Sequence, residues 1–105
     1  MNIWIITVNF GDTAPTREFI GSIENSFNKK GIKVFIADNQ STRKSKKDLK
    51  EIKNNSKLSI KIISYNKNIF YWPSIKKTLK NNIKSIKDYP DWMLLCNNDI
   101  AINDK

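Results

Sequence analysis

Short apolar runs and amphipathic segments alternate along the 105-residue chain. Four runs are rich in β-branched and aromatic residues and have the length of strands. They cover residues 3–8, 33–37, 58–65 and 92–96. Between them, apolar side chains recur at helical spacing in three segments. We expect helices over residues 14–28, from a Ser45 cap to the "NNSK" of residues 54–57, and from Pro73 to Ile86.

The predicted order of elements is βαβαβαβ. Strands that alternate with crossover helices form a mostly parallel sheet with helices on both faces. The nearly continuous apolar character of the strands agrees, because such a sheet is buried on both sides. A chain of this length supports one core. We therefore expect a single α/β domain over residues 1–105, a Rossmann-like three-layer sandwich around a four-stranded sheet.

Polar side chains follow every predicted strand. They are Asn9 and Asp12, then Asp38, Asn39 and Ser41, then Asn66 and Asn68, and finally Asn97, Asn98 and Asp99. Each alone is typical of a turn. Ligands of parallel sheets, however, gather at the carboxyl ends of the strands, where all four groups would meet. Carboxylate and amide oxygens there would suit Mg²⁺ or Mn²⁺ beside a diphosphate, which itself supplies most of the metal ligands.

Composition narrows the classes of function. The net charge of +9 favours anionic partners, although lysines spread over helices are also typical of a solvated surface. The absence of His excludes His-based acid–base catalysis, and three glycines form neither a P-loop nor a dinucleotide-binding turn. The single Cys96 predicts a reduced, packed thiol. We find no secretory signal and no apolar run of about 20 residues, so we expect a cytoplasmic protein.

Four segments also share the order and spacing of motifs in one enzyme family. They are "IITVNF", "FIADNQST", "NKNIFYWPSI" and "WMLLCNNDI". With these motifs the whole chain resembles the nucleotide-sugar-binding half of family 2 glycosyltransferases of the GT-A fold. It is most similar to the branch that contains rhamnosyltransferases and other bacterial polysaccharide enzymes.

The resemblance implies specific roles for residues at the strand ends. Thr7, Val8 and Asn9 would line the nucleotide cleft, and Asp38 would hydrogen-bond the base or ribose of a UDP- or dTDP-type sugar donor. Asp99 would bind the divalent cation, with Asn97 at the first position of the metal motif. The rest of the implied donor site consists of Asn39, Asn68 and Asn98.

Two departures bear on activity. Phe70 stands where the family has a glycine, and the sequence stops just after the metal motif. The resemblance therefore implies a truncated GT-A fold that lacks the acceptor-binding half and the general base. We expect a metal-dependent, inverting transferase domain that is inactive alone, with a polysaccharide or lipid-linked acceptor. Further expected partners are an acidic membrane at the inner face, a second copy of the chain, or the missing half.

Two alternatives stay open. One is a degenerate binding or regulatory module that keeps the fold without chemistry, which the neutral Asn97 and Phe70 favour. The other is a basic RNA-binding α/β domain that stacks bases on Phe70, Tyr71 and Trp72. We favour a packing role for these aromatics over RNA binding, because three consecutive aromatics before a helix more often cover the core and no nucleic-acid signature accompanies them.

Overall fold

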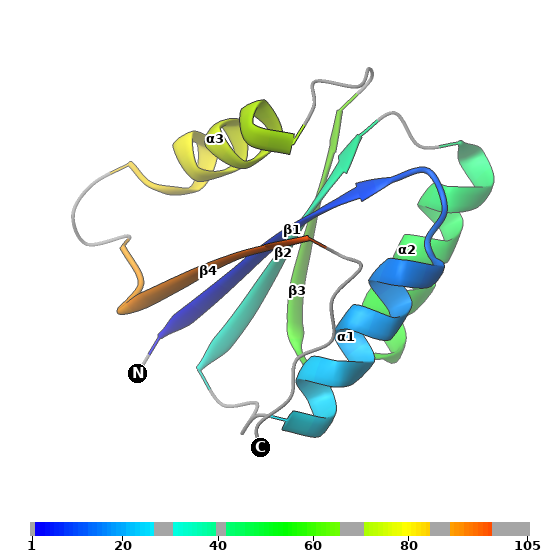
Figure 1. Ribbon diagram of the computed structural model, residues 1–105, viewed down its shortest axis with the longest axis horizontal. Coiled ribbons are helices and arrows are strands. Elements are labelled where there is room, and N and C mark those ends of the chain that lie inside the picture. The colour runs from blue at the N-terminus through cyan, green and yellow to red at the C-terminus, as the bar shows by residue number, and fades with distance from the viewer. Residues whose placement is uncertain (1, 27–30, 40–41, 66–70, 85–88, 98–105) are drawn as a thin grey trace.

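The computed structural model describes residues 2–26, 31–39, 42–65, 71–84 and 89–97. Strands and helices alternate in the predicted order (Figure 1). The strands are β1 (Ile3–Phe10), β2 (Ile32–Asn39), β3 (Ser59–Tyr65) and β4 (Trp92–Asn97). The helices are α1 (Ala14–Ser26), α2 (Arg43–Asn55) and α3 (Tyr71–Asn82).

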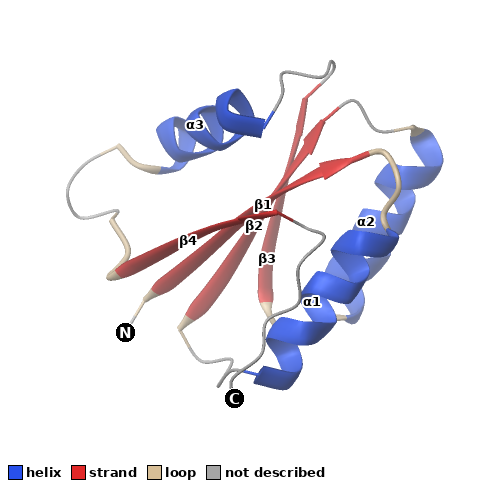
Figure 2. Cartoon of the chain, viewed as in Figure 1, coloured by secondary structure: helices blue, strands red, loops and turns tan. Residues whose placement is uncertain are grey.

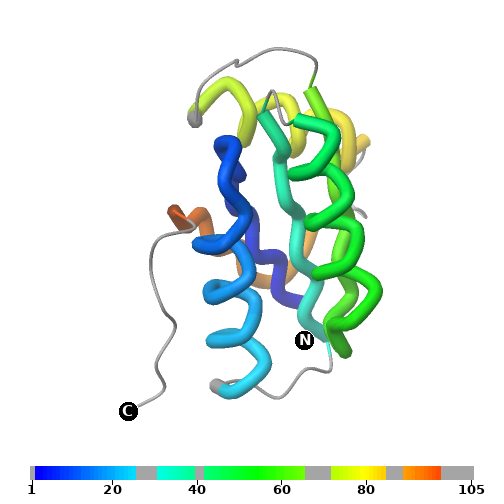
Figure 3. Tube along the Cα trace, turned by 90° about the vertical axis from the view of Figure 1, so that its right-hand side faces the viewer, coloured from blue at the N-terminus to red at the C-terminus, as the bar shows by residue number. Residues whose placement is uncertain are grey.

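The four strands form one sheet in the order β3-β2-β1-β4, and every pair is parallel (Figure 2). The chain moves outward from β1 to β3 through α1 and α2, and α3 then brings it back to β4 beside β1. The helices α1 and α2 cover one face of the sheet and α3 the other (Figure 3). The predicted three-layer α/β fold is therefore confirmed, and strand order reverses between β1 and β4.

Each face of the sheet has its own core. On the first face, Phe19 and Ile23 of α1 and Leu49 of α2 pack on alternate residues of the strands. On the second, Ile75 and Leu79 of α3 pack over the strand residues in between. Both sets of alternate strand positions are thus buried, which explains the nearly continuous apolar strands of the sequence.

Element boundaries differ from the prediction in three ways. The strands β1 and β2 extend through the polar residues that were expected to lie in loops, and end at Phe10 and Asn39. The cap of α2 is Thr42 and not Ser45, because the Thr42 hydroxyl accepts a hydrogen bond of 3.1 Å from the backbone N–H of Ser45. In the third helix, Tyr71 precedes the predicted start. Phe27 and Ile86 lie outside the described residues.

Within the described ranges, no helix has the length and apolar composition needed to span a membrane.

Candidate functional site

The parallel register brings polar residues together at the carboxyl edge of the sheet. Asn9 of β1 lies opposite Asp38 of β2, and Asp38 lies opposite Ser64 of β3. On the other side of β1, Val8 lies opposite Asn97 of β4. Neighbouring strands therefore present an amide, a carboxyl, a hydroxyl and a second amide along one edge.

Asp38 is the buried carboxyl of this edge. Its side chain is fully buried, and Ser64 donates a long hydrogen bond of 3.5 Å to its Oδ2. Burial raises the pKa of Asp38 above its usual value, since a carboxylate loses hydration there. The positive charge of Lys46 and hydrogen bonds with Asn9 and Ser64 oppose this effect on the pKa but do not reverse it.

Asn9 shapes the turn that follows β1. It is fully buried; its Oδ1 accepts a 2.6 Å hydrogen bond from the hydroxyl of Thr16, and its Nδ2 donates to the carbonyl of Gly11. Gly11 has a φ of 69°, a left-handed conformation that costs glycine little. Asp12 then accepts a hydrogen bond from the N–H of Ala14 at the start of α1. The amide of Asn9 thus fixes the path of the chain from strand to helix.

Thr7 and Val8 precede the carboxyl edge along β1 and are paired on both sides within the sheet. Val8 belongs to the apolar core under α3. Thr7 lies on the opposite face, between Ile36 and Cys96, and its buried Oγ1 has no hydrogen-bond partner among the described residues. Cys96 is a free, buried thiol as predicted, and burial raises its pKa.

Asn39 joins the edge to α3. Its side chain is 2% exposed, and its Oδ1 accepts a 2.8 Å hydrogen bond from the hydroxyl of Ser74. A second buried contact of 2.9 Å joins the hydroxyls of Tyr65 and Thr78. These buried polar contacts help to hold α3 over the ends of β2 and β3, in addition to its apolar face.

The predicted metal site lies at the end of β4, and the structure describes it in part. The side chain of Asn97 is exposed and stands on the strand next to Val8. Asn68, Asn98 and Asp99 lie outside the described residues. Within the described part, no group of three or more His, Cys, Asp or Glu side chains could hold a metal ion. An exposed amide at a strand end is compatible with a diphosphate-bound Mg²⁺, which needs only one or two protein ligands.

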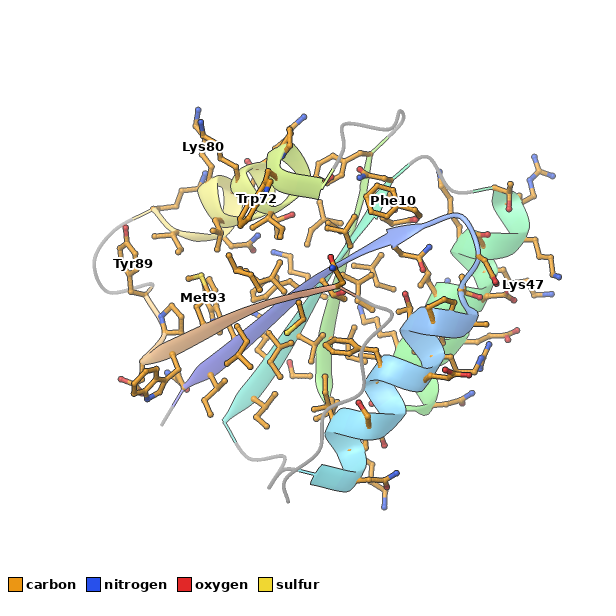
Figure 4. All side chains as sticks on the ribbon, in the orientation of Figure 1. Phe10, Lys47, Trp72, Lys80, Tyr89 and Met93 are labelled. Atoms are coloured by element: carbon orange, nitrogen blue, oxygen red, sulfur yellow. The ribbon has the colours of Figure 1, made fainter. Side chains whose placement is uncertain are left out.

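Sequence reasoning missed several residues that build this edge. Thr16, Ser64 and Ser74 supply the hydroxyls that hold Asn9, Asp38 and Asn39. Phe10 was missed as well; it ends β1 at this edge, where its ring is 44% exposed (Figure 4). Their positions in the sequence could have identified them. Thr16 lies in the first turn of a helix, and Ser64 and Phe10 lie at strand ends.

Solved structures of larger proteins share this fold. Residues 1–349 of S. aureus TarS in complex with UDP match 100% of this chain and 29% of that chain, with a TM-score of 0.78 and 20% identity. The complex of the same protein with UDP-GlcNAc matches 99% of this chain and 28% of that chain, with a TM-score of 0.69 and 20% identity.

A mannosyltransferase, PcManGT from Pyrobaculum calidifontis in complex with GDP-Man and Mn²⁺, matches 93% of this chain and 27% of that chain. Its TM-score is 0.76 and its identity 10%. The chain thus spans less than a third of the length of these proteins. The sequence matches no known family model and no curated protein. We conclude that the chain has a GT-A-like α/β fold, which it shares with these proteins.

Proposed function

We propose that the chain binds a nucleotide-diphosphate sugar with a divalent cation, as part of a glycosyltransferase that acts on a polysaccharide or lipid-linked acceptor. The carboxyl edge carries this proposal. Asn9, Asp38 and Asn97 lie there on three strands, at the reversal of strand order where α/β sheets bind ligands. Proteins with the same fold have been solved with UDP, UDP-GlcNAc and GDP-Man.

The proposed contacts are two exposed residues of the edge and the buried carboxyl of Asp38. Phe10 offers an aromatic face on which a nucleobase would stack. Asp38 is the proposed hydrogen-bond partner of the base or ribose, and the exposed Ser64 beside it marks the side from which a ribose hydroxyl would approach. Asn9 and Asn39 support the edge through their hydrogen bonds with Thr16 and Ser74.

Asn97 and Asp99 are the proposed protein ligands of Mg²⁺ or Mn²⁺. When bound, the cation would neutralise the negative charge of the donor diphosphate. Asn97 brings an oxygen but no charge, so we expect weaker metal binding than at a site with two carboxylates.

Sugar transfer itself requires more than this edge. We propose a single displacement with inversion, in which an acceptor hydroxyl attacks the anomeric carbon and the nucleoside diphosphate leaves. A general base must take the hydroxyl proton, and we propose that it belongs to a further, acceptor-binding part of the enzyme. Membership of the rhamnosyltransferase-like branch stays a prediction.

An NMR amide-shift titration tests the proposal. UDP, dTDP and GDP are added with and without Mg²⁺ to the wild type, Phe10→Ala, Asp99→Ala and the control Lys50→Ala, which changes an exposed residue of α2. We expect shifts around Asn9, Asp38 and Asn97 that weaken without Mg²⁺. We expect Phe10→Ala and Asp99→Ala each to lower affinity at least about fivefold, the loss of roughly 1 kcal/mol. No shift at millimolar nucleotide would contradict the proposal.

A second candidate is a binding module without chemistry. The hydrogen bonds of Asn9 and Asn39 inside the protein favour it, because they hold these amides away from a ligand. The same titration separates the two functions. If nucleotide causes amide shifts that are unchanged without Mg²⁺ and in Asp99→Ala, the result would support the binding module.

A further inference from the structure

An apolar groove runs between α3 and β4, on the face of the sheet opposite α1 and α2. It consists of two adjoining hollows of about 520 and 230 Å³ that share Leu79. Trp72 and Leu95 line the larger hollow, and Tyr89 and Met93 line the smaller one. We call this surface the α3–β4 groove.

Large apolar side chains around the groove are exposed to an unusual degree. Trp72 is 65% exposed, Tyr89 59% and Leu95 40%. Figure 4 shows Trp72 on α3 and Tyr89 at the other end of that helix, before β4. Isolated exposed apolar residues are common, but three beside an apolar hollow mark an interaction surface. Trp and Tyr are also the residues that prefer the interface between water and lipid.

In the part of the chain that the structure describes, the charged residues that line the groove are both lysines. Lys76 lines the larger hollow and Lys80 the smaller one, four residues apart on the same side of α3. Two like charges at this spacing repel each other, and a nearby anion would relieve the repulsion. The segment 71–84 contains two further lysines and no acidic residue. The exposed Asp91 near Tyr89 accepts a hydrogen bond of 2.7 Å from the backbone N–H of Asn2.

These features favour one occupant over a second copy of the chain and over single-stranded nucleic acid. A second copy of the chain would bring another net charge of +9 to a surface that is itself basic. Single-stranded nucleic acid stacks on flat aromatic faces, whereas Ile75, Leu79 and Leu95 give the larger hollow an aliphatic floor. An anionic bilayer has a partner for each of these groups. Its acyl chains match the aliphatic floor, its interface matches Trp and Tyr, and its phosphates match Lys.

We propose that the α3–β4 groove is a docking surface for an anionic lipid bilayer. Trp72 and Tyr89 enter the interface, and Lys76 and Lys80 lie at the level of the lipid phosphates. The chain offers a control for the aromatic contact in Trp92. Trp92 is 62% exposed, close to the 65% of Trp72, but it alternates along β4 with Met93 and therefore points to the opposite face. The proposal depends on this surface alone and is independent of nucleotide binding at the carboxyl edge.

Sedimentation with lipid vesicles tests the proposal. The intact chain is mixed with vesicles of phosphatidylcholine alone and with vesicles in which about a third of the lipid is phosphatidylglycerol. We expect binding to the anionic vesicles and at least about tenfold weaker binding to the neutral ones. Trp72→Ala should weaken binding at least about fivefold, and Trp92→Ala less than about twofold.

A charge-matched pair of double variants locates the contact. K76E/K80E changes the groove, and K47E/K50E makes the same change in net charge on α2, across the sheet (Figure 4). We expect K76E/K80E to weaken binding about 30-fold or more, and K47E/K50E less than about fivefold. Circular dichroism of each variant checks that the fold is kept.

Four results of the vesicle assays would each overturn the proposal. They are equal binding to neutral and anionic vesicles, equal losses in the two double variants, equal losses in Trp72→Ala and Trp92→Ala, and no binding to either vesicle. A dimer that Trp72→Ala dissociates, measured by light scattering, would assign the groove to a second copy and overturn the bilayer. Tighter binding to single-stranded RNA than to vesicles, lost in Trp72→Ala, would do the same.

Discussion

At the scale of single residues, the carboxyl edge combines complete burial with polar chemistry. Asn9 and Asp38 are both fully buried, and each is held by a hydroxyl from a neighbouring element. A buried polar group without a partner costs about 1–3 kcal/mol, so these hydroxyls stabilise the edge. The exposed Phe10 and Asn97 are supported by this buried layer. The edge therefore combines a buried, hydrogen-bonded layer with exposed contacts.

The raised pKa of Asp38 predicts a pH dependence of stability. Between its usual value of 3.8 and its higher pKa in the folded state, the folded protein binds more protons than the unfolded chain. The free energy of unfolding contributed by this group therefore falls as the pH rises through that window. Asp38→Asn removes the ionisation. We expect the stability of Asp38→Asn relative to the wild type to increase from pH 4 to pH 7.

Urea unfolding at the two pH values measures this difference. Ser64→Ala provides the complementary test, because it removes a hydrogen bond that lowers the pKa of Asp38. Its loss of stability relative to the wild type should be larger at pH 7 than at pH 4. If Asp38→Asn shifted stability equally at both pH values, Asp38 would not titrate with a raised pKa.

At the scale of elements, the order and the packed faces could be predicted from the sequence and the boundaries could not. The spacing of Leu49 and Ile52 was enough to identify α2 and its buried side. The ends of β1 and β2 were misplaced because Asn9 and Asn39 read as turn residues. Hydrogen bonds from Thr16 and Ser74, distant in sequence or in another element, keep them in the strands. Such partners are set by tertiary structure.

The cap of α2 gives a prediction at this scale. Thr42 accepts a hydrogen bond from the N–H of Ser45, which satisfies a backbone donor of the first turn. We expect Thr42→Ala to lower the free energy of unfolding by about 1 kcal/mol, and Thr42→Ser to keep most of it. Ser45→Ala keeps the backbone donor and should cost less. Thermal unfolding of the three variants measures this, and a larger cost for Ser45→Ala would restore Ser45 as the cap.

The location of the candidate site at the carboxyl edge could be predicted from the sequence, but the contacts of its side chains could be predicted only in part. The periodicity of strands and helices places the ends of four parallel strands together, and the register confirms this for Asn9, Asp38 and Asn97. The pattern could not show that the Asn39 side chain turns toward α3, because that depends on Ser74. The ligand roles of Thr7, Val8, Asn9, Asp38 and the other named residues stay predictions. Asn68, Asn98 and Asp99 lie outside the described residues.

At the scale of the whole molecule, a large positive charge surrounds two separate apolar layers. Nineteen Lys and Arg residues oppose ten Asp and Glu residues, for a net charge of +9. Repulsion among these charges destabilises the compact state, and dissolved salt screens it. The two layers each bury one face of the sheet and do not depend on charge.

This balance predicts that salt stabilises the protein. Raising sodium chloride from about 0.02 M to about 0.3 M shortens the Debye length from about 20 Å to about 6 Å. We therefore expect the free energy of unfolding to increase, measured by urea titration at each salt concentration. The variant K47E/K50E lowers the net charge from +9 to +5 and should show a weaker response. A fall in stability with salt would mean that specific charge pairs outweigh the general repulsion.

The pairing of β1 with β4 also matters for how the chain is made. The two strands meet through residues that are 89 positions apart, as in the contact of Asn2 with Asp91. A ribosome that adds about 5–20 residues per second needs roughly 4–18 seconds to cover that distance. Throughout that time β1 has at least one unpaired edge, which is open to other nascent chains. Chaperones that shield β1 during translation are therefore expected to govern the yield of folded protein.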